Sequence, residues 1–500
     1  MSGVVVNIVR HGFYLDSVAL MRYSREISVM EGVEEVALMM GTPSNREIMA
    51  EAGVLAPDGE TATAWDLVIG VRAKDRKTAD EAVAQAEGLL DQSGSTRGVD
   101  QAWRPRTIRA AARSVPEANL ALISVSGDFA PAEARQALNS GLHAMVFSDN
   151  VPLEQEVRLK LEAERSGRLL MGPDCGTAII NGVPLGFANR VEKGDVGIVG
   201  ASGTGMQEIF CLISREGGGI SQAIGAGGRD LKEEVGGITT LMAIDVLDAD
   251  PDTRHIVLVS KPPAPSVAAR VLDRIRESSK PFTVCFLGAS PMVLPKNAHL
   301  APTLKAAAES ALGDRSVDAG FDAGQTAIFP PNGGKSVVGL FSGGTLCVEA
   351  QYVFCDAGQQ VCSNVAIPGA GNLGQKQFIH RFIDLGDDEH TRGRPHPMID
   401  PAVRDDALRE ALEDPDVGVV IVDLILGFGA HHDPAGHFVE SLSQRGADGP
   451  VVIASVTGTD ADAPSRSSQV SRLTEAGVLV APSSADAAYL ALACLESKGG

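Results

Sequence analysis

The chain has 500 residues, which is too long for a single hydrophobic core, and its 44 % hydrophobic content is ample for about three or four domains. A formal net charge of −21 at pH 7 argues against a nucleic acid or an anionic membrane surface as the partner. Seven cysteines, an odd number without Cys-x-x-Cys spacing, favour reduced thiols and a cytoplasmic location over a disulfide framework.

The first two predicted domains alternate strand-like and helix-like patterns. Residues 1–92 predict a small α+β domain without a catalytic motif, and residues 91–106 predict a linker. Residues 107–192 carry a βαβαβ pattern that predicts a parallel, Rossmann-like sheet. This sheet leads to a loop containing Asp174 at a strand's carboxyl end, where α/β sheets bind ligands. No Gly-x-Gly-x-x-Gly opens the domain, so a dinucleotide has little support.

The remaining chain contains two homologous α/β units, residues 193–314 and residues 335–497. The sequence Val196-Gly-Ile-Val-Gly-Ala-Ser-Gly-Thr204 of the first unit is echoed by Val338-Gly-Leu-Phe-Ser-Gly-Gly-Thr345 of the second. Each copy predicts a buried strand, a tight turn and a helix. Both units later repeat a helix, an Asp-Pro-Asp stop and a buried strand, which indicates an internal repeat.

The two repeated turns are candidate anion sites. A helix that begins at such a turn directs free backbone N–H groups and the positive end of its dipole at a ligand. Two such helices that point at one place would bind phosphate strongly. The predicted phosphate- and substrate-binding residues of the two turns are Ser202, Gly203, Thr204, Ser342, Gly343, Gly344 and Thr345.

Further candidates follow other predicted strands, where loops rich in polar groups and glycine are typical of active sites. They are Gly227, Gly228, Gly371, Asn372, Thr459, Asp460 and His431. The run His431-His-Asp-Pro-Ala-Gly-His437 matches no zinc motif, and adjacent histidines generally point apart, so no metal site is predicted. A substrate-facing base and a solvated loop remain as its two interpretations.

The chain resembles a known superfamily in three motifs. Arg168-Leu-Leu-Met-Gly-Pro-Asp-Cys-Gly176, the first repeated turn and Ile224-Gly-Ala-Gly-Gly228 resemble the alpha subunit of succinyl-CoA synthetase. The second unit resembles the ligase domain of that enzyme's beta subunit, and the order of all four parts is similar to the FdrA proteins. The resemblance implies an α/β fold class: a small α+β domain, a Rossmann-like CoA-binding-type domain and two flavodoxin-like, ligase-type parallel-sheet domains.

The departures from the family motifs bear on the chemistry. No glycine-rich strand–helix precedes Leu120, the ATP-grasp domain is absent, and the Gly-His-Ala-Gly-Ala phosphohistidine loop is missing, although His299 lies near its place. Lys261 stands where the family has a glutamate that holds the phosphohistidine, and a cation there would attract a phosphate directly. CoA or nucleotide binding therefore has little support, and no cofactor is predicted.

The resemblance implies an FdrA-like subunit of a multi-subunit carbamoyl- or acyl-phosphate transferase, with carbamoyl transfer between carbamoyl phosphate and oxamate in purine and allantoin breakdown. Lys261 and the helix N–H groups would hold the phosphate, and Asp174, His431 or Asp460 would orient the acceptor. The expected partners are a small anionic substrate and other subunits of an oligomeric enzyme. The alternatives are a subunit of an NDP-forming acyl-CoA ligase and a non-catalytic scaffold with a degenerate ligase fold.

Overall fold

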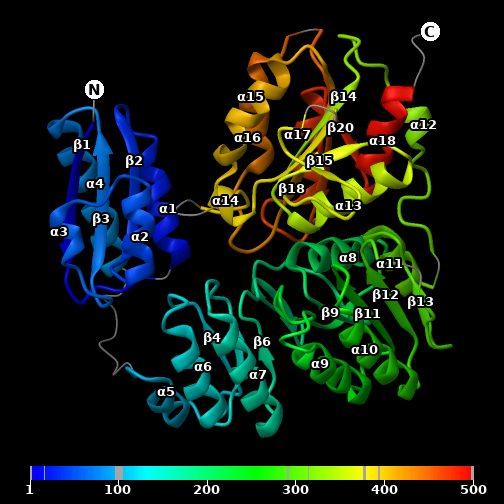
Figure 1. The fold of residues 1–500 in the computed structure, drawn as a ribbon, viewed down its shortest axis with the longest axis horizontal. Coiled ribbons are helices and arrows are strands. Elements are labelled where there is room, and N and C mark those ends of the chain that lie inside the picture. The colour runs from blue at the N-terminus through cyan, green and yellow to red at the C-terminus, as the bar shows by residue number, and fades with distance from the viewer. Residues whose placement is uncertain are drawn as a thin grey trace. The chain divides into compact units, whose positions relative to one another are not determined.

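The computed structural model describes residues 3–496 except residue 16 and residues 96–104, 290–291, 314, 376–378, 392–394 and 447. The chain divides into two compact units, and Figure 1 labels their helices and strands. Unit 1 consists of residues 1–168 and 388–395, and unit 2 of residues 169–387 and 396–500. Among the described residues, no helix is both long enough and apolar enough to cross a membrane.

Unit 1 begins with a three-stranded antiparallel sheet of order β1-β3-β2. Its core packs Leu67 and Ile69 of the central strand against Ile27 and Leu90, all of them fully buried. The last helix runs on to Ser95, into the predicted linker, and the following residues 96–104 lie outside the described part. The elements are β1 (Val4–Arg10), α1 (Ser17–Ser28), β2 (Val33–Met40), α2 (Pro43–Glu51), α3 (Pro57–Glu60), β3 (Leu67–Ala73) and α4 (Arg76–Ser95).

The rest of unit 1 contains two short parallel strands, β4 and β5, with flanking helices. Helix α7 ends at Gly167, whose φ of 61° supplies the left-handed residue that commonly ends a helix. Within α7, Lys160 and Glu156 form a completely buried ion pair at 3.2 Å. The elements are α5 (Ile108–Ser114), β4 (Leu120–Ile123), α6 (Ala130–Asn139), β5 (His143–Val146), α7 (Leu153–Ser166) and α14 (Asp388–Thr391).

The first sheet of unit 2 has seven strands in the order β13-β12-β11-β9-β10-β7-β8. Strands β9 to β13 are parallel, and the β7–β8 hairpin joins them antiparallel at Ala223 and Ile179. This hairpin, predicted as part of the preceding domain, therefore extends the sheet of the first repeat. The elements are β6 (Leu170–Met171), β7 (Thr177–Ile180), β8 (Val183–Gly186), β9 (Lys193–Gly200), α8 (Gly203–Arg215), β10 (Ile220–Gly225), α9 (Ile238–Ala249), β11 (His255–Ser260), α10 (Pro265–Glu277), β12 (Phe282–Phe286), β13 (Ala298–Leu300) and α11 (Leu304–Ala311).

The second sheet of unit 2 is wholly parallel, in the order β16-β15-β17-β14-β18-β19-β20. Its strand β18 is buried along its entire length, as a strand covered by helices on both faces should be. The elements are α12 (Ala323–Thr326), β14 (Ser336–Phe341), α13 (Gly344–Asp356), β15 (Val361–Ser363), β16 (Gly371–Asn372), β17 (His380–Asp384), η1 (Pro401–Arg404), α15 (Asp405–Glu413), β18 (Val417–Ile425), α16 (Pro434–Ser441), η2 (Leu442–Gln444), β19 (Val451–Thr457), α17 (Arg466–Glu475), β20 (Leu479–Ala481) and α18 (Ser484–Glu496).

The two sheets repeat one topology. The order β13-β12-β11-β9-β10 of the first matches β20-β19-β18-β14-β17 of the second, and both are the flavodoxin-like order. In each sheet the central strand, β9 or β14, leads directly into the helix of the repeated motif, α8 or α13. The predicted α/β fold class with two homologous parallel-sheet domains is confirmed.

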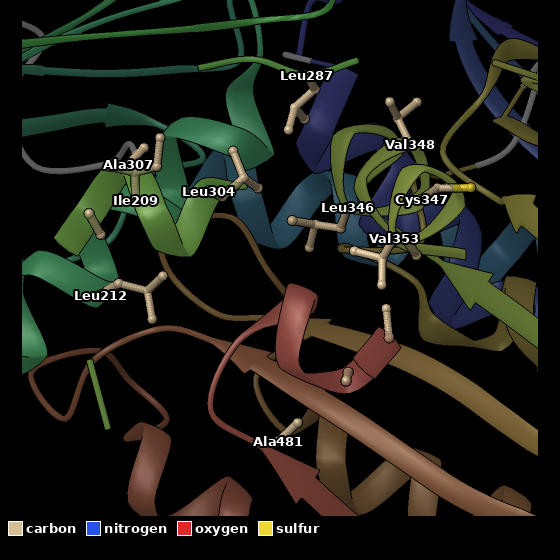
Figure 2. Packing of buried hydrophobic residues seen from close by; sticks show 14 of the residues in the cluster. Ile209, Leu212, Leu287, Leu304, Ala307, Leu346, Cys347, Val348, Val353 and Ala481 are labelled. Carbon is tan, nitrogen blue, oxygen red and sulfur yellow. The ribbon is translucent and has the colours of Figure 1, made fainter. Parts of the chain in front are cut away.

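One continuous core joins the two parallel-sheet domains of unit 2. Figure 2 shows Ile209 and Leu212 of α8, Leu304 of α11, and Leu346 and Val353 of α13 packed in the same cluster of buried hydrophobic residues. Burial of apolar surface contributes about 25 cal/mol per Å² removed from water, so this shared cluster holds the two domains together. Helices α8 and α13 therefore have a fixed relative position.

Candidate functional site

Helix α8 begins as the sequence predicts, with a serine cap. Ser202 has an extended backbone, with φ −152° and ψ 113°, and its Oγ accepts a hydrogen bond from Gly205 N at 3.0 Å. The next turn closes through Met206 N, which donates to Ser202 O. The N–H groups of Gly203 and Thr204 have no hydrogen-bond acceptor within the described part of the chain. They leave the positive end of the α8 dipole open to an anion.

Helix α13 begins differently, because a buried carboxylate occupies its turn. Asp423 of β18, which has 0 % exposure, accepts hydrogen bonds from Ser342 N at 2.6 Å and Gly343 N at 2.7 Å. Both N–H groups, including that of the predicted phosphate-binding residue Gly343, therefore bond to a carboxylate of the protein. Among the described residues, the N–H groups that can still face a ligand at the start of this helix begin with that of Gly344.

Arg404 completes the α13 turn. Its guanidinium donates to Asp423 Oδ1 at 2.8 Å and to Ser342 Oγ at 2.7 Å. The hydroxyl oxygen of Ser342, a predicted ligand-binding residue, therefore accepts a hydrogen bond from within the protein. Burial lowers the pKa of Arg404, and the neighbouring Asp423 opposes that shift. The buried pair thus fixes the turn and leaves Ser342 a structural role.

The two predicted helix starts meet directly. Ser202 Oγ and Thr345 Oγ1 share a hydrogen bond across the domain boundary. A Cβ built on Gly343 would lie 3.1 Å from Thr204 Cβ, closer than ordinary van der Waals contact. The structure therefore brings together Ser202, Thr204, Gly343 and Thr345, which the sequence proposed as one anion site. Small residues at the turns permit this approach.

Asp384, which the sequence analysis did not select, lies against the start of α13. It ends strand β17 and is 6 % exposed, and its Oδ1 accepts from Gly386 N at 2.9 Å. Its Oδ2 would lie 2.4 Å from a Cβ built on Gly344, so this oxygen covers the first residue of α13. Burial raises the pKa of Asp384 to about 7, opposed by the Gly386 hydrogen bond and the charge of Lys261.

Lys261 follows strand β11 and is exposed. Its positive charge is one of the influences that lower the pKa of Asp384, so the lysine of one domain acts on a carboxyl of the other. Lys261 therefore contributes a cation to the region of the two helix starts, where the sequence analysis expected one.

A second group of predicted residues contacts the start of α8. A Cβ built on Gly203 would lie 3.1 Å from Thr177 Oγ1, which places the end of the Asp174 loop against this helix. Asp174 Oδ2 is 3.5 Å from a Cβ built on Gly228, and Gly227, with φ +85°, packs on Pro173 O. The loop of Asp174 and the glycines after β10 thus adjoin the α8 start.

Three other predicted residues are engaged in helix capping or domain contacts. Thr459 is 5 % exposed, and its Oγ1 donates to Arg190 O at 2.7 Å while its N–H donates to Asp462 Oδ2 at 2.8 Å. Asp460 accepts a hydrogen bond from Ser467 N at 2.7 Å, which lowers the pKa of Asp460. The ring of His431 lies 4.4 Å from that of His432, and the backbone N–H of His431 donates to Met398 O.

The remaining candidates lie on other parts of the fold. Gly371 and Asn372 form β16, the edge strand beside β15. His299 is exposed on β13, the opposite edge of the first sheet from the β7–β8 hairpin. His437, near His431, pairs with Asp405 at 3.0 Å. Among the described residues, no group of three or more His, Cys, Asp or Glu side chains is placed to hold a metal ion.

Three family models match the chain. Residues 1–105 match the heavy metal-associated domain of AllF, residues 191–288 match the CoA binding domain, and residues 340–494 match CoA-ligase. The CoA-binding match thus covers most of the first repeat, whereas the sequence analysis gave the CoA-binding-type label to residues 107–192.

Relatives of known sequence and structure extend these matches. The chain is 42 % identical over 507 residues to the uncharacterized protein YahF of Escherichia coli K12, covering 97 % of both chains. It is 29 % identical to ADP-forming succinate–CoA ligase subunit alpha 2 of Archaeoglobus fulgidus over 33 % of this chain and 57 % of the relative, so it spans little more than half of that subunit. Dinucleotide forming acetyl-coenzyme A synthetase 1 of Ca. Korarchaeum cryptofilum aligns with 18 % identity, a TM-score of 0.32 and coverage of 78 % of this chain and 84 % of that one.

Proposed function

Since the chain belongs to the FdrA-type family of the succinyl-CoA synthetase superfamily, we propose that it is the phosphate-binding subunit of a multi-subunit carbamoyltransferase. The proposed reaction transfers a carbamoyl group between carbamoyl phosphate and oxamate. The oxamate nitrogen attacks the carbamoyl carbon, the bond from that carbon to the phosphate oxygen breaks, and the nitrogen loses a proton. The products are oxalurate and phosphate.

The observation that carries this proposal is the contact between Ser202 and Thr345 at the starts of α8 and α13. The contact supports a site in which the open N–H groups of Gly203 and Thr204 bind the phosphate of the substrate. Lys261 adds a positive charge, which a phosphate needs in a chain of net charge −21. Such a site stabilises the leaving phosphate without a covalent intermediate on the protein.

The acceptor is proposed to approach from the Asp174 side. The Asp174 loop contacts the α8 start, and the carboxylate lies beside Gly228, which supports a role in orienting oxamate. His431 and Asp460 are weaker proposals for the same role, because Asp460 already accepts the Ser467 N–H and the ring of His431 lies against that of His432. Other subunits are proposed to complete the acceptor site, as the alpha-subunit names of several relatives suggest by analogy.

Calorimetric titration of the full chain with phosphonoacetamide, a stable analogue of carbamoyl phosphate, tests the phosphate site. We expect saturable binding that weakens when Thr204 is replaced by Pro, because proline removes one of the two open N–H groups. A chain that binds no phosphonate at any accessible concentration would overturn the proposed function. Thermal unfolding of the variant separates lost binding from lost folding.

A second candidate function is a subunit of an NDP-forming acyl-CoA ligase. The matches to the CoA-binding and CoA-ligase models favour it. That reaction needs a phosphorylated histidine, and His299, the residue near the family position, is exposed on an edge strand. Titration with CoA distinguishes the two candidates: tight CoA binding favours the ligase, and phosphonoacetamide binding without CoA binding favours the carbamoyltransferase.

A further inference from the structure

The start of α13 carries a largely buried carboxyl group, one oxygen of which accepts no hydrogen bond from the described residues. Asp384 is 6 % exposed, and its Oδ1 is bound to Gly386 N at 2.9 Å, which fixes the plane of the carboxyl group. Its Oδ2 accepts no hydrogen bond from the described residues and lies over Gly344. This oxygen is not fully buried, so it can accept a hydrogen bond from a ligand that carries an N–H or O–H group.

The two helix starts therefore offer different chemistry. The α8 start has open N–H groups at Gly203 and Thr204 and suits an anion. The α13 start is already occupied on its inner side by Asp423, and Asp384 covers its first residue, so a second anion there would be repelled. A ligand that spans the contact between Ser202 and Thr345 would place its phosphate at the α8 start and a hydrogen-bond donor at Asp384.

We propose that Asp384 Oδ2 accepts a hydrogen bond from the amino group of a carbamoyl phosphate whose phosphate binds at the α8 start. This assignment rests on the proposed function and names the substrate class: the site selects a carbamoyl phosphate over an acetyl phosphate of the same shape. The acetyl group has a methyl where the carbamoyl group has its amino group. A bound acetyl phosphate would therefore offer Asp384 Oδ2 no donor.

The charged groups around Asp384 are compatible with this role. The positive charge of Lys261 lowers the pKa of Asp384, whereas the like charges of Asp387 and Asp423 raise it. The charge of Asp423 is in turn compensated by Arg404 at 2.8 Å. A neutral amino donor adds no further charge to this balance, whereas a second carboxylate or phosphate oxygen at Asp384 would.

The test uses two phosphonates of equal charge and similar shape on the full chain: phosphonoacetamide, which carries the amide, and acetonylphosphonate, which carries a methyl ketone. We expect the amide to bind at least about tenfold more tightly, as a site built around an N–H donor should. In Asp384→Asn the Gly386 N–H retains the amide oxygen, so an NH₂ group replaces Oδ2. We expect this variant to lose the preference, with the two affinities within about threefold of each other.

Each outcome bears on a different claim. Equal binding of both phosphonates to the native chain, or an unchanged preference in Asp384→Asn, overturns the role of Asp384 while the phosphate site stands. Binding of neither phosphonate overturns the proposed function and this assignment with it. Asp387→Asn removes a neighbouring negative charge without touching the Gly386 hydrogen bond, and we expect it to keep the preference. Thermal unfolding of each variant confirms that the fold is retained.

Discussion

Glu208 of α8 and Glu349 of α13 occupy equivalent positions in the repeated helices, and each reaches into the other domain. Glu208 accepts a hydrogen bond from Ser484 N at 3.0 Å, at the start of α18, and Glu349 accepts one from Leu304 N at 2.7 Å, at the start of α11. Each carboxyl group therefore satisfies a helix N-terminus of the opposite domain. The two domains therefore resemble each other in the polar contacts that they make across their interface as well as in their topology.

Glu349→Gln should reduce the pH dependence of stability. Burial raises the pKa of Glu349 from 4.5 to about 8. Between these values the folded state holds a proton that the unfolded state releases, so the free energy of unfolding falls as the pH rises through this window. The loss is at most about 1.4 kcal/mol per pH unit, and glutamine, which cannot ionise, removes it.

Chemical unfolding of both proteins at pH 5, 6.5 and 8 measures this difference. We expect the variant to gain stability relative to the native chain as the pH rises, while the exposed Glu413→Gln control follows the native chain. Parallel pH curves for native chain and Glu349→Gln would contradict the shift.

Local sequence was enough to predict the helix starts but not their environment. Ser202 and Thr345 belong to strand–turn–helix motifs whose residues are adjacent in the chain, so the pattern alone indicated them. Asp423 caps Ser342 from 81 residues away, and Asp384 reaches Gly344 from another strand. Which residues become such partners depends on the order of the strands in the sheet, which the sequence pattern does not specify.

The sequence contained a signal for one of these two carboxylates, Asp423. Asp423 interrupts an otherwise apolar strand, and a charge there must find a partner once the strand is buried. Thr459 and Asp460 show a different effect: a polar residue after a strand often caps the next helix or bridges two domains, as Asp460 does at Ser467 and Thr459 does at Arg190.

Gly344→Ala should disturb the site more than the fold. The new Cβ would lie 2.4 Å from Asp384 Oδ2, so the carboxyl group must move away from the start of α13. We expect a loss of stability of about 1–3 kcal/mol and a loss of the preference for phosphonoacetamide over acetonylphosphonate. Gly320→Ala, where a Cβ meets nothing within 4 Å, is the matched control and should change neither property. Unaltered ligand preference in Gly344→Ala would show that Asp384 does not act from its present position.

No phosphoryl label should be retained on the protein. His299 is exposed on edge strand β13, and β12 and β11 separate it from β9, so the paired helix starts that follow β9 and β14 are not beside it to stabilise a phosphoryl group. Incubation with radioactive ATP or acetyl phosphate, followed by denaturation, measures this directly. Acid-labile, alkali-stable label that disappears in His299→Asn would instead establish a phosphohistidine and favour the ligase function.

Lys261→Ala should weaken phosphate binding while leaving the fold intact. The side chain is exposed, so its removal deletes a charge and no core contact. A hydrogen bond or close contact from an ammonium group to a phosphate is worth about 1.5–3 kcal/mol, and solvent exposure places the expected effect near the lower limit, about a tenfold loss of affinity for phosphonoacetamide. Lys296→Ala, which removes another exposed lysine of the same domain, is the control. The loss should shrink at high salt, because an exposed charge is screened. If calorimetry gives the same affinity for both variants, Lys261 does not contact the phosphate, and the α8 N–H groups bind it without a side-chain cation.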